Sequence, residues 1–264
     1  MTDAPLRRLL QRLWPTLRLV AAVLIVALGF RSLVAEPFTV EQTSMAPTLI
    51  PGDQVLVTKV AYGYNRYSFP FHWPPIDGRL LPRPVERGDI VVLRLTRGAG
   101  ANFIKRVIAL PGETVRLKDG QVFIDGIAVP RTPLSPLSAG PAARAICGDT
   151  ADGPRSDERC RLRRYRERLP NGVAYVVLDV QKNGPEDTSR TFQVPPGHVF
   201  VLGDNRDRSK DSRHPLSVGT GYVPMDRLIG RADRIVFSRA ADGPPWRPRQ
   251  WLAAFRPDRW WKEL

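Results

Sequence analysis

The chain has 264 residues, 42% of them hydrophobic, which is room for one large domain or two small ones. Its 26 prolines and 21 glycines are more than a mostly helical protein usually contains. Its formal net charge of +14 at pH 7 favours an anionic partner, which can be membrane lipid or nucleic acid. Two cysteines and three scattered histidines, without a Cys-x-x-Cys motif, argue against a zinc site, and we expect no metal and no cofactor.

An apolar segment near the N-terminus is the first predicted element. Residues 19–30 are uncharged, and the extended stretch 14–34 has about the length that crosses the ~30 Å core of a bilayer. Arg18 and Arg31 lie near its ends, where long side chains reach the membrane interface. Further arginines precede the segment and place the N-terminus in the cytoplasm; they are Arg7, Arg8 and Arg12.

A cleaved signal peptide is the alternative to a retained anchor. Leu33 is larger than the small residue preferred at that position of a cleavage site, so the sequence favours the anchor. We therefore expect a cytoplasmic N-terminus at residues 1–12, a single transmembrane anchor at 13–35 and the rest of the chain across the membrane.

The remaining chain predicts strands rather than helices. Runs rich in β-branched residues alternate with turns of Gly, Pro and Asp, and they cover residues 54–60, 89–95, 103–110, 114–119, 121–129, 173–180 and 198–204. Asp119 and Gly120 predict a hairpin turn between two of these runs. The fold class expected is mainly β, an antiparallel sheet body with its core at 36–130 and 190–240. The aromatic, Pro-rich residues 62–84 are too irregular for a strand.

Two segments depart from this pattern. Residues 131–189 are rich in Pro, Ala, Gly and Arg and predict an inserted, loop-rich subdomain, in which the arginine run 161–168 is expected to be a solvated face rather than a nucleic-acid site. In an oxidising compartment Cys147 and Cys160 could pair or remain free thiols. The tail 241–264 interleaves Trp and Phe with Arg and Lys, which suits an anionic membrane surface; a disordered tail is the alternative.

Four motifs follow the anchor in a fixed order. They are SMAPTLIPGD at 44–53 (after EPF at 36–38), RGDIVVL at 87–93, FIKRVIALPGE at 103–113 and GDNRDRSKDSR at 203–213. Together they resemble the bacterial type I signal (leader) peptidases, membrane-anchored serine proteases with a Ser-Lys dyad. The resemblance covers roughly residues 14–130 and 190–240 and is poor in the 131–190 segment and in the tail.

The resemblance implies that Ser44 is the nucleophile and Lys105 the general base. A serine hydroxyl is a weak nucleophile at neutral pH until a base takes its proton, and lysine can act as that base only when it is neutral. Burial in apolar surroundings lowers a lysine pKa, and Lys105 is flanked by Phe103, Ile104, Val107 and Ile108. An outward-facing lysine on an edge strand is the alternative.

The charged segment 203–213 is expected, by the same resemblance, to hold the site together. Ser209 would hydrogen-bond the Lys105 amine and orient it, and Arg106 would pair with Asp204. The other residues expected in ion pairs are Arg206, Asp211 and Arg213. A polar surface loop is the alternative for this segment.

An oxyanion hole and substrate pockets complete the expected site. The Ser44 N–H would be the first oxyanion donor, and the family often places a second serine two residues earlier, where this chain has Gln42. The Gln42 amide or the Thr43 hydroxyl could serve instead. Positions that match the family's pocket lining, and that are otherwise ordinary core, are Phe38, Val40, Met45, Phe103 and Ile104. Shallow apolar pockets would select small residues, and the peptide would bind extended at a sheet edge.

The function expected is that of a serine endopeptidase that removes signal peptides from exported preproteins. It would be a single-pass protein of the bacterial inner (cytoplasmic) membrane, with the catalytic domain on the periplasmic side, and it would contact anionic lipid but no nucleic acid. One alternative is a peptidase dedicated to one secretion or conjugation system. Another is a non-catalytic, basic membrane-surface binding protein, which leaves Ser44 and Lys105 unexplained.

Overall fold

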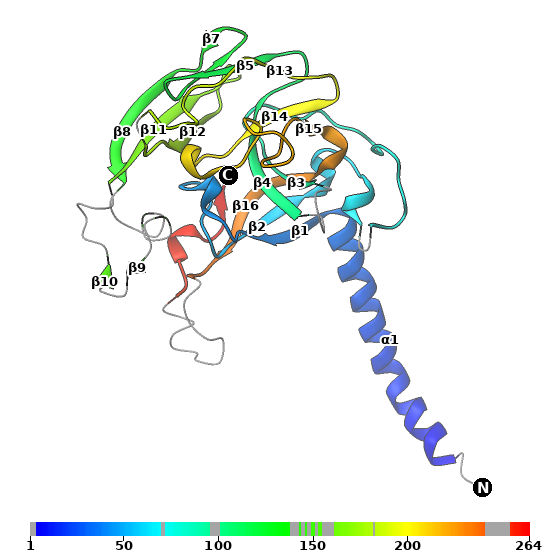
Figure 1. Cartoon of the computed structure of the whole chain (residues 1–264). Helices are drawn as coiled ribbons and strands as arrows, with labels where there is room; N and C mark the ends of the chain where they lie inside the picture. Colours follow the sequence, from blue (N-terminus) through cyan, green and yellow to red (C-terminus); the bar gives the residue numbers. More distant parts are fainter. Residues whose placement is uncertain are drawn as a thin grey trace.

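The chain folds into one long N-terminal helix and a mainly β body, seen in Figure 1 as a computed structural model. The structure describes residues 4–69, 72–95, 101–137, 143, 146, 149–150, 153–154, 161–181, 183–240 and 254–264. Cys147 and Cys160, and with them the question of a disulfide, lie outside the described residues. The predicted fold class, an antiparallel β body behind an apolar helix, is confirmed.

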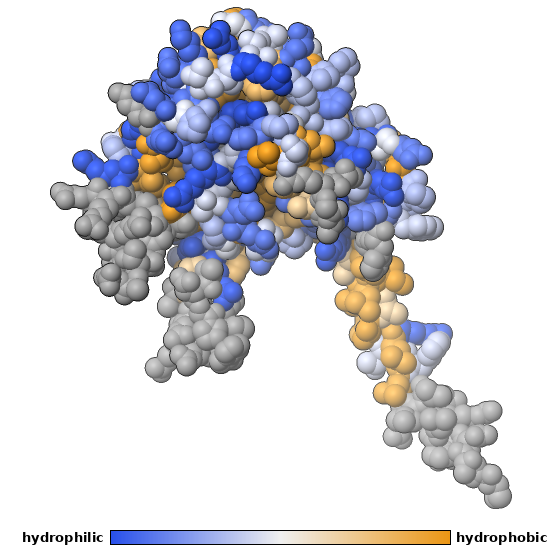
Figure 2. All heavy atoms as spheres, in the orientation of Figure 1, coloured by the Kyte–Doolittle hydropathy of each residue, from blue (hydrophilic) through white to orange (hydrophobic). Residues whose placement is uncertain are grey.

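Helix α1 (Ala4–Leu33) projects away from the body (Figure 1). Its stretch Leu13–Leu33 has 21 residues, a mean hydropathy of 2.0 and no burial inside the protein. This length corresponds to about 32 Å of helix, enough to cross a membrane, and Figure 2 shows the apolar surface along it. The helix already begins at Ala4, and strand β1 begins at Ala35, so the end of the predicted anchor lies outside the helix.

The large sheet has eight antiparallel strands in the order β1-β2-β16-β3-β4-β14-β15, with β17 paired to β16. Their bounds are β1 Ala35–Thr39, β2 Asp53–Thr58, β3 Ile90–Leu95, β4 Ala101–Ala109, β14 His198–Leu202, β15 Val223–Pro224, β16 Leu228–Ser238 and β17 Lys262–Glu263. The runs predicted at 54–60, 89–95, 103–110 and 198–204 correspond to β2, β3, β4 and β14.

The central strand β16 is the longest strand, and the sequence did not predict it. Two irregularities in its pairing with β2, at Ala232/Arg234 and Ile235/Phe237, break the alternation of buried and exposed residues. Bulges of this kind remove the period of two on which strand prediction depends. Gly230 lies where a Cβ atom would be 2.6 Å from Thr58 O, so the close approach of β2 requires a glycine there.

Two smaller sheets cover one side of β4 and β14. One has the order β13-β5-β6-β7, with β5 Thr114–Lys118, β6 Gln121–Ile124, β7 Ile127–Ala128 and β13 Phe192–Gln193. The predicted hairpin turn is confirmed, with positive φ at Asp119 (51°) and Gly120 (74°) between β5 and β6. The run predicted at 121–129 divides into two strands, because Asp125 and Gly126 form a second turn with positive φ.

The other small sheet has the order β12-β11-β8 and lies in the predicted insertion. Its strands are β8 Arg131–Leu137, β11 Leu162–Arg168 and β12 Ala174–Leu178, and a short pair joins β9 Asp149–Thr150 to β10 Gly153–Pro154. The arginine run is therefore a strand, β11, that pairs with β12 on one side and β8 on the other. The expectation that this run is a solvated face is wrong at Glu167, which is fully buried. Whether residues 131–189 form a separate subdomain remains a prediction.

Three hydrophobic clusters position the functional residues. One face of β4 and β14, through Ile108, Phe200 and Leu202, packs against the two smaller sheets. A second cluster under β2 and β16 includes Met45 and Leu49, which follow Ser44 closely in the sequence. The third contains Val91, Val107 and other residues of β3, β4 and β14. Each fully buried aliphatic side chain contributes about 1.5–3 kcal/mol, so the chain around Ser44 is anchored by packing.

Short 3₁₀ turns connect the strands. They are η1 Thr43–Met45, η2 Lys59–Ala61, η3 Arg66–Ser68, η5 Arg206–Arg208, η6 Met225–Arg227 and η7 Pro257–Arg259. The C-terminal residues 254–264 pack against β16, so the alternative of a disordered tail is wrong for this part of the chain. The rings of Phe237 and Phe255 stack there with centroids 5.4 Å apart.

Candidate active site

Ser44 lies in the turn η1, which follows the extended residues after β1. Met45, 1% exposed, and Leu49, fully buried, fix the turn to the core below it. The Ser44 carbonyl accepts a hydrogen bond from Asn205 N at 3.1 Å, and the Asn205 amide donates to Thr43 O at the same distance. Residues 203–205 thereby hold the backbone on both sides of the serine.

Lys105 comes from β4, where it pairs with Val91 of β3. Its Nζ atom lies 2.8 Å from Ser44 Oγ and 3.1 Å from the Ile104 carbonyl, and the residue is only 2% exposed. The alternative of an outward-facing lysine is therefore wrong. Burial lowers the pKa of Lys105 to about 8, although the nearby carboxylates Asp211 and Asp204 oppose this shift.

Arg106 and Asp204 form a buried bidentate ion pair beside the lysine. Arg106 Nε and Nη2 lie 2.8 and 2.7 Å from the two Asp204 oxygens. Asp204 also accepts a hydrogen bond from the Thr48 hydroxyl at 2.5 Å. Two parallel charge-assisted bonds fix both distance and orientation, so this pair ties β4 to the 203–213 segment.

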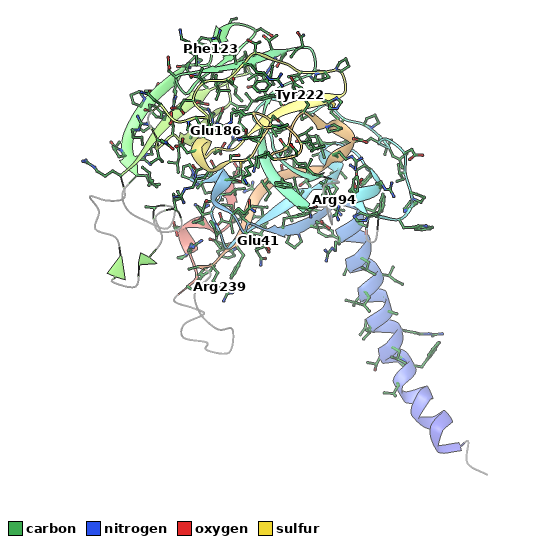
Figure 3. The ribbon with its side chains drawn as sticks, in the orientation of Figure 1. Glu41, Arg94, Phe123, Glu186, Tyr222 and Arg239 are labelled. Carbon is green, nitrogen blue, oxygen red and sulfur yellow. The ribbon has the colours of Figure 1, made fainter. Side chains whose placement is uncertain are left out.

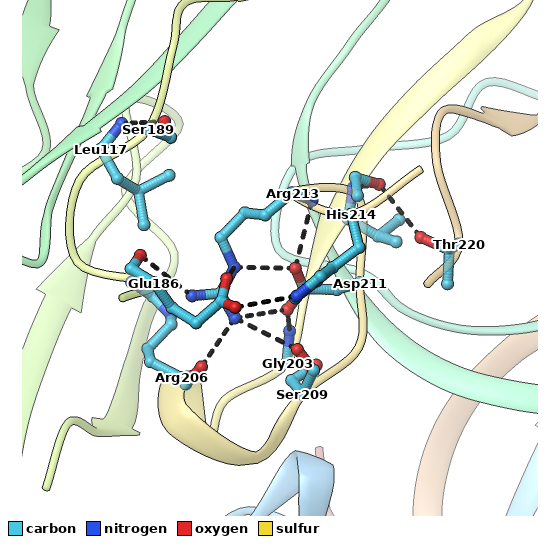
Figure 4. A network of polar contacts seen from close by, with 12 residues as sticks. Leu117, Glu186, Ser189, Gly203, Arg206, Ser209, Asp211, Arg213, His214 and Thr220 are labelled. Atoms are coloured by element: carbon cyan, nitrogen blue, oxygen red, sulfur yellow. Dashed lines mark hydrogen bonds and ion pairs between the residues drawn. The ribbon is translucent and has the colours of Figure 1, made fainter. Parts of the chain in front are cut away.

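Asp211 and Arg213 form the second ion pair of the 203–213 segment (Figure 4). Arg213 Nε and Nη2 lie 2.8 and 2.9 Å from the Asp211 oxygens, and Gly203 N donates to Asp211 at 3.0 Å. Burial alone would raise the pKa of Asp211, but the Arg213 guanidinium and the Gly203 N–H lower it below its usual value. The Asp211 carboxylate stays ionised. Through its bond from Gly203 N it fixes the start of the 203–205 turn, in which Asn205 binds the backbone at Ser44.

Ser209 does not make the hydrogen bond to Lys105 that the sequence predicted. Its Oγ atom is buried, and no partner among the described residues lies within good hydrogen-bonding geometry, although the hydroxyl is near enough to Asp211 to help lower the pKa of that carboxyl. It packs against Gly203 so closely that a Cβ atom there would overlap it. The 2.8 Å contact of Lys105 Nζ is made with Ser44 instead. The expected bond is not formed because the Ser209 side chain lies against the backbone at Gly203 and not against Lys105.

Arg206 pairs with Glu167 of β11, a partner outside the motifs. Tyr175 of β12 donates a hydrogen bond to the same carboxylate at 2.8 Å, and Arg106 lies over the Tyr175 ring at 4.4 Å from its centroid. These contacts connect the three-stranded sheet to the ion pair of Arg106. Glu167, Tyr175 and Thr48 were not among the residues predicted from the sequence. The one signal in the sequence that could have pointed to Glu167 is that it is the single acidic residue within the arginine run 161–168.

A cavity of about 440 Å³ opens beside Ser44 and Lys105. Its lining contains both of these residues, Gln42, Glu41 (labelled in Figure 3), Thr39, Ala101, Asn102 and the five predicted pocket residues Phe38, Val40, Met45, Phe103 and Ile104. Thr43, the alternative oxyanion donor, is not part of this lining. The Ser44 N–H has no acceptor among the described residues.

Two open strand edges border the cavity. β1 has β2 as its only partner in the described sheet, and β14 pairs with β4 only along Arg106–Ala109. The half of β4 from Ala101 to Lys105 therefore has one unpaired edge. An extended peptide can add its backbone hydrogen bonds to such edges.

One acidic cluster among the described residues has a spacing that could hold a metal ion. Single oxygens of Asp179, Asp187 and Asp207 lie within 4.8 Å of one another. Arg131 already forms an ion pair with Asp179, and Asp207 accepts hydrogen bonds from two backbone N–H groups. The cluster does not line the cavity, and we assign no metal to it.

Comparison with known proteins identifies the family of the chain. The family model described as signal peptidase, peptidase S26, matches residues 13–237. The signal peptidase I of Rickettsia typhi is 35% identical over 224 residues, 82% of this chain and 77% of the relative. That of Rickettsia massiliae is 36% identical over 224 residues, 82% and 76% of the two chains.

A solved structure of a signal peptidase I from Enterococcus faecalis matches with 24% identity and a TM-score of 0.29, covering 56% of this chain and 97% of the other. The family model spans well over half of the sequence, and its match begins at the start of the apolar stretch Leu13–Leu33. The chain belongs to the signal peptidase family, peptidase S26.

Proposed function

We propose that this signal peptidase cuts its substrates with a Ser-Lys dyad, in which Ser44 is the nucleophile and Lys105 the general base. The observation that carries the proposal is the 2.8 Å contact between Ser44 Oγ and a lysine that is only 2% exposed. A lysine with a pKa of about 8 is neutral in a useful fraction of molecules near neutral pH. No histidine is required for this chemistry.

The chemical steps follow from that contact. Neutral Lys105 takes the proton of Ser44 Oγ as the oxygen attacks the carbonyl carbon of the scissile peptide bond. The tetrahedral intermediate collapses, the resulting ammonium donates its proton to the departing amine, and an acyl-enzyme ester remains on Ser44. Lys105, neutral again, then takes a proton from the water that attacks the ester, and it returns this proton to Ser44 Oγ as the ester bond breaks and the acid is released.

The oxyanion hole is proposed to consist of the Ser44 N–H and the Gln42 side-chain amide. The Ser44 N–H lacks an acceptor among the described residues and lies in the turn η1, directly after Gln42 and Thr43, of which Gln42 has an extended backbone. Gln42 is exposed and lines the cavity, whereas Thr43 does not. An amide is a good donor to a developing negative charge in a site that excludes water.

The substrate is proposed to lie extended between β1 and the free half of β4. Phe38, Val40, Met45, Phe103 and Ile104 give this cavity apolar walls, which favour small side chains at the first and third positions before the cut. We propose that the substrates are signal peptides of exported preproteins with a small-x-small cleavage site.

The cellular arrangement is also a proposal. The apolar half of α1 supports a single-pass anchor, and the arginines before it support a cytoplasmic N-terminus. The catalytic domain would lie on the periplasmic side of a bacterial inner membrane. Ser44 is the tenth residue after Val34, a span of about 35 Å at full extension, so the nucleophile stays near the lipid.

One assay tests the function directly. The full-length protein in detergent is incubated with a preprotein that carries an Ala-x-Ala site and with the same preprotein carrying bulky residues at both positions. We expect a single cut after the second alanine and no cut in the bulky variant. Cleavage of several unrelated preproteins would exclude a peptidase dedicated to one system, and absence of any cleavage would contradict the proposal.

A further inference from the structure

The C-terminal segment, residues 254–264, lies against the nucleophile loop, residues 43–53. β17 joins the segment to β16 through the pairs Arg234–Glu263 and Ile235–Lys262. A bridge between Arg239 and Phe255 holds its beginning (Arg239 is labelled in Figure 3), and Leu264 packs on the same cluster as Met45. The last residues of the chain therefore belong to the wall of the catalytic body.

Arg259 makes the central contact between the two segments. Its Nε and Nη2 atoms lie 3.0 and 2.5 Å from the two Asp53 oxygens, and Nη2 also donates to the Thr48 carbonyl at 2.9 Å. Asp53 is fully buried and Arg259 is 6% exposed. A bidentate pair that also binds a loop carbonyl fixes the loop more strictly than an exposed ion pair would.

A second arginine of the segment contacts the same loop. Arg256 Nη1 lies 2.9 Å from the Pro51 carbonyl. Within the loop, Asp53 accepts a hydrogen bond from Ile50 N at 2.8 Å. The C-terminal segment thus binds two backbone carbonyls of the loop and the carboxylate that closes it.

The loop is held from the opposite side by the catalytic network. The Thr48 hydroxyl donates to Asp204, whose carboxylate forms the bidentate pair with Arg106, the neighbour of Lys105. Thr48 is therefore bound at its carbonyl by Arg259 and at its hydroxyl by Asp204. Four residues earlier, the same loop presents Ser44 to Lys105.

We propose that Arg259 is a positioning residue, by which the C-terminal segment holds the nucleophile loop so that Ser44 stays in contact with Lys105. The inference rests on the proposed Ser-Lys mechanism. Proton transfer requires the two atoms within about 0.5 Å of their productive position, and a displacement of about 1 Å can cost a hundredfold in rate. The loop joins β2 at Asp53, so losing the contacts of Arg259 with Asp53 and Thr48 releases the half of the loop between these two residues.

The test compares full-length variants in the preprotein assay, with kcat, KM, the pH profile and thermal unfolding measured for each. Arg259→Gln is expected to lower kcat about tenfold to a hundredfold with KM changed by less than about threefold. Its ascending pH limb should move to higher pH, because a displaced loop leaves Lys105 less desolvated. Arg259→Lys keeps the buried positive charge but cannot reproduce all three bonds, so a smaller loss of kcat is expected.

Arg234→Gln is the matched control. Arg234 binds Glu263 and the Trp261 carbonyl of the same C-terminal segment, and none of its described contacts reaches the nucleophile loop. We expect its kcat and pH profile to equal those of the unmodified protein. A loss of kcat that Arg234→Gln shares equally would overturn the inference.

The inference is also overturned if Arg259→Gln, assayed below its unfolding temperature, keeps the kcat and the pH profile of the unmodified protein. If Arg259→Gln does not fold, Arg259→Lys decides, and an unchanged kcat in that variant overturns the inference. A Ser44→Ala variant separates the two levels. If it still cleaves, the proposed dyad fails and the inference with it; if it is inactive while the Arg259 variants are normal, the inference alone fails.

Discussion

Lys105 Nζ lies 2.8 Å from Ser44 Oγ, although sixty-one positions separate the two residues in the sequence. β4 supplies the lysine and the turn η1 supplies the serine, and both residues are buried where they line the cavity, with Ser44 8% and Lys105 2% exposed. The contact makes both side chains indispensable in the proposed mechanism, because each is useless without the other.

Ser44→Ala and Lys105→Ala are each expected to abolish cleavage while leaving the fold intact. Removing one member of a dyad removes the nucleophile or its base, with a loss of about 10⁴-fold or more in kcat. The measurement is preprotein cleavage, with circular dichroism and thermal unfolding to show that the variants fold. Lys118, exposed on β5 and outside the cavity lining, offers Lys118→Gln as a control that should retain activity. Cleavage by either alanine variant would remove the dyad assignment.

Cleavage should rise with pH as Lys105 loses its proton. Burial lowers the pKa of Lys105 to about 8. Lys105 is therefore mostly neutral, and able to act as a base, only when the pH is above that value. The kcat/KM profile is therefore expected to have an ascending limb centred near that value, with about one tenth of the maximal rate at pH 7.

A second buried lysine provides the control for that limb. Lys59 is 1% exposed, its pKa is also lowered by burial, and it contacts Glu36 and the Ser68 carbonyl, away from the cavity lining. Lys59→Met should keep the ascending limb where it is. A limb that disappears in Lys59→Met, or a flat profile in the unmodified protein, would show that Lys105 is not the titrating base.

The motifs allowed the site to be predicted more fully than the fold. Ser44, Lys105 and the five cavity residues lie in short segments of fixed local pattern. β2 alternates regularly between buried and less buried positions, and β3, β4 and β14 are short apolar runs rich in β-branched residues. β16 was missed because its bulges and its charged residues break the period of two. Glu167 could not be assigned a partner from the sequence, because its contact with Arg206 depends on how a separate sheet packs on β4 and β14.

Asp204→Ala is expected to destabilise the protein strongly. It leaves Arg106, which is 4% exposed, as a buried charge without its bidentate partner, and such a loss costs about 3–5 kcal/mol. Asp226→Ala is the matched control, since Asp226 is half exposed and its ion pair with Arg227 is long, at 3.9 Å. We expect that change to cost no more than about 0.5 kcal/mol. Urea unfolding measures both values, and equal free energies of unfolding for the two variants would contradict the role given to the Arg106 pair.

Gln42→Ala should lower kcat about tenfold to a thousandfold with little change in KM, because an oxyanion donor acts mainly in the transition state. Thr43→Ala is the comparison, since Thr43 does not line the cavity and the variant should keep nearly full activity. Steady-state kinetics with one preprotein separates the two. A large loss in Thr43→Ala together with normal kinetics in Gln42→Ala would reverse the choice of donor.

The exposed rings of the C-terminal segment are expected to bind anionic lipid. Trp260 and Trp261 are 62% and 56% exposed, and basic residues surround them in the sequence, a composition that places rings in the headgroup layer of a membrane. A form without residues 1–33 should bind anionic liposomes, and replacing both tryptophans with alanine should weaken that binding about tenfold while Arg259 keeps the segment in place. Ile127→Ala is the control, because Ile127 is 73% exposed in β7, which lies at the end of the body away from α1 (Figure 1). Liposome sedimentation measures all three, and equal binding of the double variant and the parent would show that these rings do not dock on lipid.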